Sequence, residues 1–429
     1  MTTDPLNRKD AQARDAQDPM SRFRERFYLK PDTLYMDGNS LGLLSRDSEA
    51  AVLQALENWK TLGIDGWLQA DPPWFWLGEE LGKRQASLVG AEDDEVVVTG
   101  SITVNLHALV ATLYAPTPER RGILATALDF PSDVYALQAH IRHTGGDPER
   151  DLLLAPSSDG RTIDEDALIE MLDKRVALAS LPSVLYRSGQ LLDMERITRI
   201  ARERDIIIGW DCAHSAGVIP HHFSEWGADF AVWCTYKYMN SGPGAVGALY
   251  LNRRHFGRTP ALPGWWGYAK ERQFDMLHEF EHAPSAGGWQ ISTIGVLSAA
   301  PLIGSLAILN EAGIDNVRAR SQALTTYLIA CMEDQGLTGS DYGYTIGSPL
   351  DAERRGGHVA VEHPAAPQIV RALKARGVVP DFRPPNVIRL APVPLYVSYT
   401  DVWDTVQHLR DIVDSGEYRT LAGSRELVS

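Results

Sequence analysis

Short apolar runs alternate with amphipathic stretches between about residue 90 and residue 252 of the chain. The runs that predict strands are EVVVTG, RGILATALDF, DLLLA, VALASLPSVLY, DIIIGWD, DFAVWCTYK and GALYLN. The stretches that predict helices between several of them include DEDALIEMLDK and MERITRIARER. This alternation predicts an α/β fold with a mostly parallel, seven-stranded type of sheet and helices on both faces.

The pattern changes after an apolar stretch at 291–313, which predicts a long helix that closes the large domain. The elements predicted beyond it are a helix at 315–334, strand HVAVEH, helix PQIVRALKARG, strand NVIRLAP and a last helix in DVWDTVQHLRDIVDSG. In that last helix one apolar stripe is formed by Val402, Val406, Leu409 and Val413, and Gly416 is the predicted stop. The expected domains are an N-terminal arm at 1–45, a large domain at 46–300 and a smaller C-terminal α/β domain at 301–429.

With 429 residues, 44% of them hydrophobic and 23% charged, the chain has the composition of a globular protein large enough for two domains. The formal net charge of -15 argues against binding to nucleic acid or to an anionic membrane, and favours a small-molecule ligand. The first twenty residues are polar and no long apolar run follows, so no targeting signal or membrane span is predicted. The three cysteines, Cys212, Cys234 and Cys331, lack metal-ligand spacing, which favours a cytoplasmic protein without a metal site.

An acid and a lysine follow two successive predicted strands: Asp211 ends DIIIGWD, and Lys237 ends DFAVWCTYK. Because ligands of open α/β sheets bind beyond the carboxyl ends of the strands, both side chains are expected to face one crevice. A single lysine after a strand is most often an exposed surface residue. Together, however, the pair meets the needs of a pyridine cofactor that carries an aldehyde and a phosphate, since a lysine forms its Schiff base and a carboxylate keeps its ring nitrogen protonated. His214 then either contacts this cofactor or is a structural residue.

A candidate phosphate site opens the next helical stretch, TGSITVNLHALV. Free backbone N–H groups at Ser101 to Thr103 attract an anion, although both side chains are equally suited to capping the helix. In ALDFPSD, Phe130 ends a strand where its ring can stack on a ligand, and Pro131 to Asp133 are expected to form a polar turn. Tyr236, next to Lys237, is expected to reach the phosphate.

The chain resembles the kynureninase family in segments that run in the family's order from residue 35 to residue 396. These segments are YMDGNSLGLL, VVVTGSITVNLH, DFPSD, WDCAHSAG, WCTYKYMNSGPG, PGWWGY and IRLAPVPLY. The set is more specific than D-x-A-H alone, which cysteine desulfurases and other aminotransferase-like enzymes share. The resemblance implies a fold-type I enzyme that binds pyridoxal 5′-phosphate on Lys237 and works as a homodimer with active sites at the subunit interface.

The resemblance also implies roles for individual residues. Those implied to contact the cofactor are Ile102, Thr103 and Tyr236 at the phosphate, Phe130, Pro131, Ser132, Asp133 and His214 around the ring, Asp211 at the ring nitrogen, and Trp265 and Thr293 from the partner subunit. Arg389 is implied to clamp the substrate's α-carboxylate, for which a planar guanidinium is suited. A family position that usually holds a hydroxyl residue falls at Pro182, so either Ser183 supplies that contact or it is absent.

The implied activity is hydrolysis of L-kynurenine to anthranilate and L-alanine, or of 3-hydroxy-L-kynurenine to 3-hydroxyanthranilate. The sequence leaves open whether the reaction serves tryptophan catabolism or NAD biosynthesis. Lys237 is expected to move the Cα proton, with Tyr236 assisting as a general acid or base and Asp211 supporting the cofactor ring.

The preference between the two substrates turns on Thr293. Family members that favour the hydroxylated ring tend to carry asparagine there, and an apolar ring pocket is suggested by Trp67, Trp74, Trp76 and Trp265. We therefore expect unsubstituted kynurenine to be preferred, because such a pocket does not satisfy an extra hydroxyl. The alternative is that Thr293 only caps the helix that begins near it.

Two other functions fit parts of the sequence. A cysteine desulfurase or selenocysteine lyase needs a reactive cysteine on a mobile loop, but Cys331 lies in an apolar helical pattern, where a buried, inert thiol is expected. A catalytically inactive binding protein on the same fold would not need Asp211, Lys237 and Arg389 together, and its purified form would be colourless.

Overall fold

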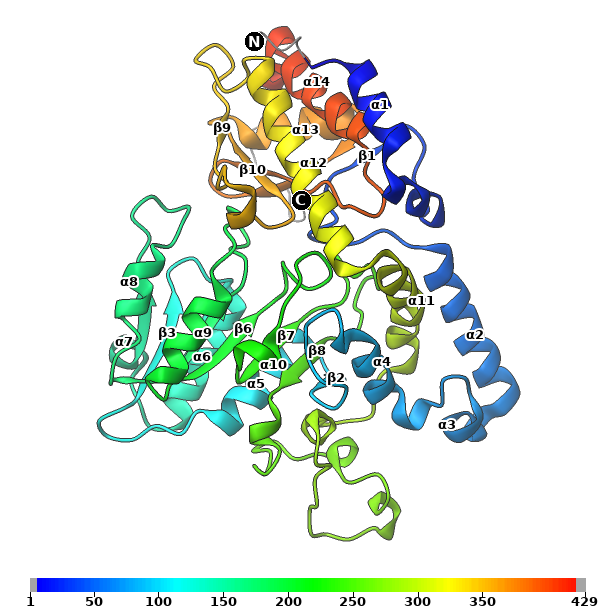
Figure 1. Ribbon diagram of the computed structural model, residues 1–429, viewed down its shortest axis with the longest axis vertical. Coiled ribbons are helices and arrows are strands. Elements are labelled where there is room, and N and C mark those ends of the chain that lie inside the picture. The colour runs from blue at the N-terminus through cyan, green and yellow to red at the C-terminus, as the bar shows by residue number, and fades with distance from the viewer. Residues whose placement is uncertain (1–5, 422–429) are drawn as a thin grey trace.

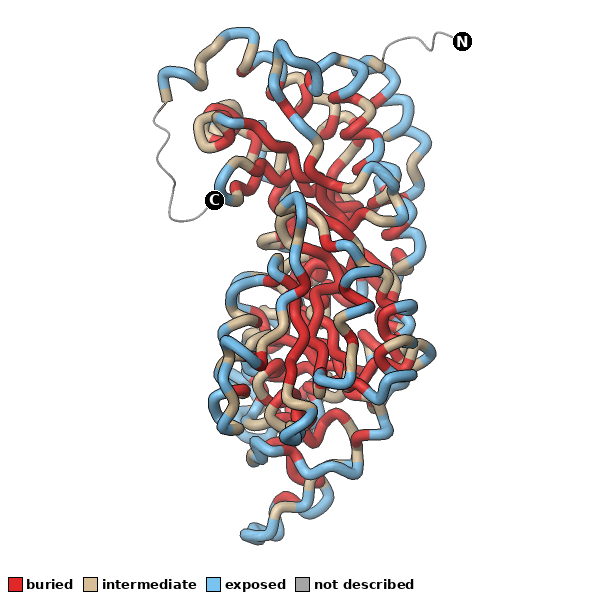
Figure 2. The backbone as a smooth tube through the Cα atoms, turned by 90° about the vertical axis from the view of Figure 1, so that its left-hand side faces the viewer, coloured by how far each residue is buried: buried red, intermediate tan, exposed pale blue. Residues whose placement is uncertain are grey.

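The computed structural model describes residues 6–421 as two parts stacked along the long axis of the molecule (Figure 1). The larger part is built on a seven-stranded sheet and the smaller part on a four-stranded sheet. Buried backbone runs through the middle of both parts, and exposed segments lie on their outer faces (Figure 2). Residues 1–5 of the predicted arm and 422–429 of the predicted C-terminal domain lie outside the described residues.

The seven-stranded sheet confirms the predicted architecture, and each predicted run contains one strand. In spatial order the strands are β2 (Val96–Val98), β8 (Ala248–Leu251), β7 (Phe230–Trp233), β6 (Ile207–Asp211), β5 (Val176–Pro182), β3 (Gly122–Thr126) and β4 (Leu152–Ala155). Strand β8 runs antiparallel to both of its neighbours, and the other neighbouring pairs are parallel. Several strands are buried along their whole length, because helices cover both faces of the sheet.

The helices of this part are α2 (Arg46–Leu62), α3 (Gly66–Gln69), α4 (Leu77–Ala86), α5 (Ile102–Leu113), α6 (Pro131–His143), α7 (Pro148–Asp151), α8 (Glu165–Glu170), α9 (Met194–Glu203), α10 (Phe223–Trp226) and α11 (Val296–Ala312). Successive side chains of a strand point to opposite faces, and two buried clusters follow from this. Val97 packs in the cluster that contains Leu109 of α5, whereas Val98 packs in the cluster that contains Ile197 of α9. The sheet therefore has a separate hydrophobic core on each face.

Helix α11 begins five residues later than the sequence predicted. Gly295 is its N-cap in an extended conformation, a position at which glycine is well tolerated, so the segment before it is not helical. Helix α12 (Ile314–Asp334) follows directly. No single helix among the described residues is long and apolar enough to cross a bilayer, and α11 and α12 pass that test only as a pair, across an 80° bend.

The smaller part contains α12, β9 (Thr345–Ile346), β10 (Val359–Glu362), α13 (Ala366–Ala375), β11 (Val378–Val379), β12 (Asp381–Arg383), β13 (Val387–Leu390) and α14 (Tyr399–Ser415). Its sheet is antiparallel, in the order β12-β13-β10-β9. Helix α14 starts at a capping box between Ser398 and Asp401 and stops at Gly416, which is left-handed with φ 70°. Of the predicted apolar stripe, Val402, Val406 and Leu409 are buried and Val413 is half-buried.

The N-terminal segment attaches to the smaller part. Arg8 of α1 (Arg8–Gln17) pairs with Asp404 of α14 at 2.8 Å, and Asp15 accepts a hydrogen bond from the Tyr399 N–H at 2.7 Å. Strand β1 (Leu34–Tyr35) pairs in parallel with β11. Helices α1 and α14 thus lie side by side in the smaller part (Figure 1), while the domain boundaries at residues 45 and 300 stay predictions.

Candidate active site

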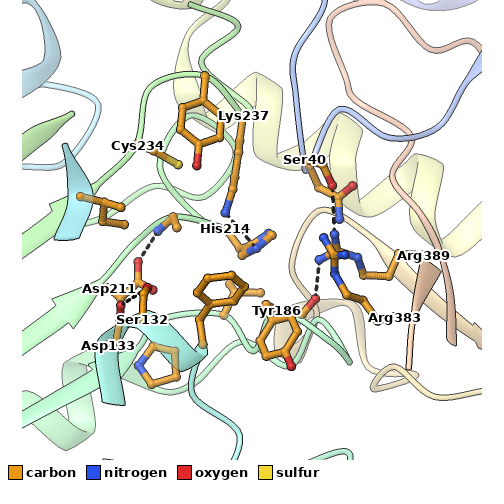
Figure 3. A pocket seen from close by; sticks show the side chains of 17 residues that line it. Ser40, Ser132, Asp133, Tyr186, Asp211, His214, Cys234, Lys237, Arg383 and Arg389 are labelled. Atoms are coloured by element: carbon orange, nitrogen blue, oxygen red, sulfur yellow. Dashed lines mark hydrogen bonds between the residues drawn. The ribbon is translucent and has the colours of Figure 1, made fainter. Parts of the chain in front are cut away.

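One cavity, of about 200 Å³, contains most of the expected site residues. It lies beyond the carboxyl ends of the parallel strands, and the side chains of β12 and β13 close its opposite side (Figure 3). The expected residues that line it are Ile102, Phe130, Ser132, Asp133, Asp211, His214, Tyr236, Lys237 and Arg389. The cavity therefore joins the two parts of the molecule.

Asp211 and Lys237 reach this cavity from neighbouring strands. β6 and β7 are parallel, with Asp211 opposite Val232, and Lys237 follows the end of β7 in a turn. The Asp211 Oδ1 accepts a hydrogen bond from the Ala213 N–H at 2.8 Å, which orients the carboxylate. The topology thus brings the acid and the lysine into one crevice, as two adjacent parallel strands require.

Three carboxyl groups gather at the Asp211 end of the cavity. Loss of hydration raises the pKa of Asp211, an effect that the nearby Lys237 charge partly opposes. Burial, and then the charge of Asp211, raise the pKa of Asp133 well above its usual value. Burial also raises the pKa of Asp129 to about 7, although the Thr126 N–H donates to its Oδ1 at 3.1 Å. A cation or a protonated nitrogen beside these acids would be stabilised, because it compensates clustered negative charge.

His214 contacts the lysine directly. Its Nε2 lies 3.1 Å from the Lys237 Nζ, and because an ammonium only donates, the imidazole nitrogen accepts. Burial, and then the Lys237 charge, lower the pKa of His214 well below its usual value, which favours the neutral, accepting ring. The ring also packs edge-on against His358, with centroids 5.9 Å apart. His214 therefore holds Lys237 in place.

The start of α5 presents backbone N–H groups next to the cavity. Ser101 is the N-cap in an extended conformation, but its side chain makes no cap hydrogen bond, so the alternative of a simple capping serine is wrong. Gly247 packs against this turn so closely that a Cβ there would lie 3.1 Å from the Ile102 nitrogen. Ile102 lines the cavity, whereas Thr103 is half-buried in the first turn and does not. The helix end has the features of an anion site.

The segment after Phe130 differs from the expected polar turn. Pro131 to Asp133 form the first turn of α6, because proline is favoured at the first helical position and an acid is favoured in the first turn. Ser132 and Asp133 line the cavity, while Pro131 is exposed outside it. The Phe130 ring is 47% exposed at the cavity and packs edge-on against Tyr186 at 5.4 Å.

Arg389 enters from β13 and is almost fully buried. Its Nη1 donates to the Tyr186 carbonyl at 2.7 Å, its Nη2 donates to the Ser40 Oγ at 3.0 Å, and it forms an ion pair with Asp381. Figure 3 shows the guanidinium facing the His214 side of the cavity, next to that of Arg383. The N-terminal DGNS segment and β13 thus meet at one arginine.

Several lining residues had no role assigned from the sequence. They are Asn39, Ser40, Pro182, Val184, Tyr186, Ala213, Cys234 and Arg383. Asn39 and Ser40 lie in YMDGNSLGLL, so that motif was the signal that pointed to them. Arg383 had no local signal, because its place depends on the pairing of β12 with β13.

Comparisons with known proteins define the family. The family model "Kynureninase C-terminal domain" matches residues 317–409. The kynureninase of Geobacillus thermodenitrificans is 51% identical over 415 residues, which cover 97% of this chain and 96% of the relative. That of Shouchella clausii is 49% identical over 419 residues, which cover 98% of this chain and 97% of the relative. The chain belongs to the kynureninase family.

Solved structures with the same fold include cysteine desulfurases. That of Thermococcus onnurineus matches with a TM-score of 0.77 at 17% identity, covering 92% of this chain and 98% of its own. The Escherichia coli cysteine desulfurase matches with a TM-score of 0.74 at 19% identity, covering 92% of this chain and 98% of its own. At this identity the likeness shows the fold alone, and it agrees with the expected fold-type I architecture.

The cysteines of this kynureninase family member do not suit desulfurase chemistry. All three are buried. Burial raises the pKa of the Cys212 thiol to about 12 and that of Cys331 to about 11, so both thiols stay protonated and unreactive. Cys234 lines the cavity, but burial raises the pKa of its thiol as well.

Trp265 and Thr293, which the kynureninase resemblance places in a partner's site, do not line the cavity of their own chain. Trp265 is 42% exposed and packs edge-on against Phe274 at 5.8 Å. Thr293 is exposed, and the alternative that it caps α11 is wrong, because Gly295 is the N-cap. Neither residue therefore serves the cavity of its own chain.

Ser183 does not take the place of the hydroxyl residue that the family usually carries at the position of Pro182. Pro182 itself lines the wall, whereas Ser183 is fully buried behind it. The Ser183 Oγ lies 2.9 Å from the Asp211 carbonyl oxygen and 2.7 Å from the Ser215 Oγ. Ser183 thus stabilises the end of β6. It does not line the cavity, so it does not supply the cofactor contact that the family's hydroxyl residue would make.

Proposed function

We propose that this protein is a kynureninase that hydrolyses L-kynurenine to anthranilate and L-alanine. The observation that carries the proposal is its near full-length relationship to kynureninases at up to 51% identity. The cavity supports it independently, since it combines a lysine, a carboxylate beside that lysine and a buried arginine. The net charge of -15 disfavours nucleic acid as a ligand, which favours a small-molecule substrate. The three free, buried cysteines favour a cytoplasmic enzyme.

Pyridoxal 5′-phosphate is the cofactor, and the chemistry of the cavity fits it. The uncapped start of α5 suits its phosphate, the carboxylate cluster around Asp211 suits a protonated ring nitrogen, and Lys237 suits its aldehyde. Phe130 supplies a ring at the cavity for its face. When bound, this cofactor serves as an electron sink for the negative charge that develops at the substrate's Cα.

Lys237 is the residue that moves the proton at Cα. Its Nζ is held by the neutral His214 nitrogen, which orients the amine toward the cavity. The Asp211 carboxyl group lies at the far end of the cavity, where its ionised form would favour a protonated ring nitrogen. Burial raises the pKa of the Tyr236 hydroxyl, so Tyr236 keeps its proton and acts as a donor.

The reaction that these residues support breaks one carbon–carbon bond. After proton removal at Cα, water adds to the side-chain ketone and the Cβ–Cγ bond breaks. The aryl carboxylic acid leaves as anthranilate, and L-alanine is completed when Cβ gains a proton and a proton is returned to Cα. Lys237 and Tyr236 are the groups of the cavity that can transfer these protons.

The working unit is proposed to be a homodimer whose subunits share their sites. Helix α2, the 3-10 turn at Gly63–Asp65 and helix α3 carry apolar side chains that are each more than half exposed: Leu53, Trp59, Ile64 and Leu68. Exposed apolar side chains on neighbouring elements are typical of an interaction site. Trp265 and Thr293, exposed and outside their own cavity, are available to a second chain.

The test is incubation of the purified protein with L-kynurenine and pyridoxal 5′-phosphate. We expect equimolar anthranilate and L-alanine, measured by chromatography. If kynurenine is unchanged while cysteine releases sulfide, the proposed function is wrong and a desulfurase takes its place. If neither substrate reacts and the protein stays colourless, an inactive binding protein takes its place.

A further inference from the structure

We propose that Arg383 is a second substrate-binding residue, which holds the α-carboxylate of the amino-acid substrate together with Arg389. The inference deepens the proposed function and rests on it for the identity of the substrate. Both arginines line the cavity, and Figure 3 shows their guanidinium groups side by side on the wall opposite Asp211. The resemblance assigns the carboxylate to Arg389 alone, and the hydrogen bonds around Arg389 are the reason to add a partner.

Arg389 has few free donors. A guanidinium carries five N–H groups. Its Nε and Nη2 both contact the Asp381 carboxylate, its Nη2 also donates to the Ser40 Oγ at 3.0 Å, and its Nη1 donates to the Tyr186 carbonyl at 2.7 Å. One N–H from Nε, two from Nη2 and one from Nη1 are thus engaged among the described residues. A carboxylate that is bound through two parallel N–H groups needs another guanidinium.

Arg383 has the donors that Arg389 lacks. Its Nε is buried without a hydrogen-bond partner, and its Nη1 has only distant acceptors, the Phe382 carbonyl at 3.3 Å and the Asp381 Oδ1 at 3.3 Å. A buried N–H without an acceptor is costly, so an acceptor from a ligand would be well placed there. The side chain is one-quarter exposed, which leaves it accessible from the cavity.

Strand pairing fixes the two arginines on one face of the small sheet. Asp381 lies opposite Arg389 in the antiparallel pair of β12 and β13, and Arg383 follows Asp381 by two residues. Side chains two residues apart on a strand point to the same face. Asp381 therefore lies between the two guanidinium groups and is a positioning residue for both.

The charges around the pair favour an anionic ligand. Burial, and then the charge of Arg389, lower the pKa of Arg383, which indicates two cations held close together. Asp37 faces the same group, but burial and the Asp381 charge raise its pKa to about 7, so it compensates the arginines only partly at neutral pH. A substrate carboxylate would supply the missing negative charge, and its two oxygens match a planar guanidinium edge.

The experiment compares ligands with and without the carboxylate. L-Alanine, the product that carries the α-carboxylate, and L-alaninamide are titrated calorimetrically into the cofactor-loaded enzyme. We expect Arg383→Gln to weaken L-alanine binding on the order of 30-fold and to leave L-alaninamide binding unchanged, because only the acid loses a charged contact. The matched control is Arg410→Gln, which removes an exposed arginine that is paired with Asp414 on α14.

Unchanged L-alanine affinity in Arg383→Gln, or an equal loss for the acid and the amide, would overturn the proposal. Should Arg383→Gln fail to fold, Arg383→Lys keeps the charge and removes the planar edge, and we expect a smaller loss that is again confined to the acid. A wild-type ratio of acid to amide affinity in that variant would also overturn it. Failure of the proposed function is seen separately, as an absence of anthranilate from the wild-type enzyme, whereas the acid and amide titrations still report the carboxylate contact.

Discussion

The carboxyl edge of the large sheet and the segment around Trp265 differ in what surrounds their expected functional residues. At the sheet edge, Asp211 and Lys237 are held by neighbouring backbone and by His214, and both face one cavity. In the other segment, Trp265 and Thr293 lie at the surface of the chain and outside that cavity. One region is a prepared binding site, and the other exposes side chains without a ligand site of its own.

This difference shows which part of a site one chain can complete by itself. The strand topology brings the cofactor-binding side chains together, because the carboxyl ends of adjacent parallel strands lie at the same edge of the sheet. The surface segment gains a role only if a second chain brings it to a cavity. Variants of the first region should therefore act within their own subunit, and variants of the second should act on the partner.

Replacement of Lys237 should have the largest effect. Lys237→Ala removes both the cofactor attachment and the amine that moves the Cα proton, so we expect kcat to fall by on the order of 10⁴-fold. Steady-state assays of anthranilate formation measure it. Lys83→Ala, at an exposed lysine paired with Asp93, is the control and should keep full activity. Turnover by Lys237→Ala within tenfold of the wild type would remove Lys237 from its role.

Replacement of Asp211 should have the next largest effect on activity. Asp211→Asn keeps the shape of the side chain but loses the charge that supports a protonated ring nitrogen, and we expect kcat to fall by about 100- to 1,000-fold. The cofactor should still bind, which its visible absorbance reports. Asp173→Asn, at a surface acid that pairs with Arg175, is the control. Normal turnover in Asp211→Asn would mean that another acid of the cluster carries the charge.

Replacement of Trp265 tests whether this residue contributes to the active site of a partner subunit. Trp265→Ala should raise KM about tenfold, the order expected when one apolar substrate contact is lost. Hybrid dimers refolded from Lys237→Ala and Trp265→Ala chains should have a higher kcat/KM than either parent, because one of their two sites is then intact. Hybrids that show only the mean activity of the parents would contradict shared sites.

The preference for the unsubstituted substrate should be the smallest effect. The apolar ring pocket predicted from Thr293 and the tryptophans would not satisfy an extra hydroxyl, so we expect L-kynurenine to be favoured over its 3-hydroxy derivative by roughly 1–3 kcal/mol in transition-state binding. Competition at equal concentrations measures the ratio of the two products. Faster accumulation of 3-hydroxyanthranilate would show that the pocket satisfies the extra hydroxyl.

Local patterns predicted the elements better than they predicted contacts between them. The apolar runs predicted all seven strands of the large sheet, because a strand depends on a short stretch of chain. Asp211 and Lys237 were predicted to share one crevice because each follows the end of such a strand. Pro131 to Asp133 were mistaken for a turn, although a proline followed by an acid also starts a helix. Arg383 was missed because its neighbours come from strand pairing and from the distant Asp37.

The central claim is that Lys237 carries the cofactor at the edge of the large sheet. Borohydride reduction of the pure, yellow enzyme followed by peptide mapping tests it most directly. We predict that one peptide is modified and that the pyridoxyl group is on Lys237. A label on any other lysine, or no label at all, would contradict the account.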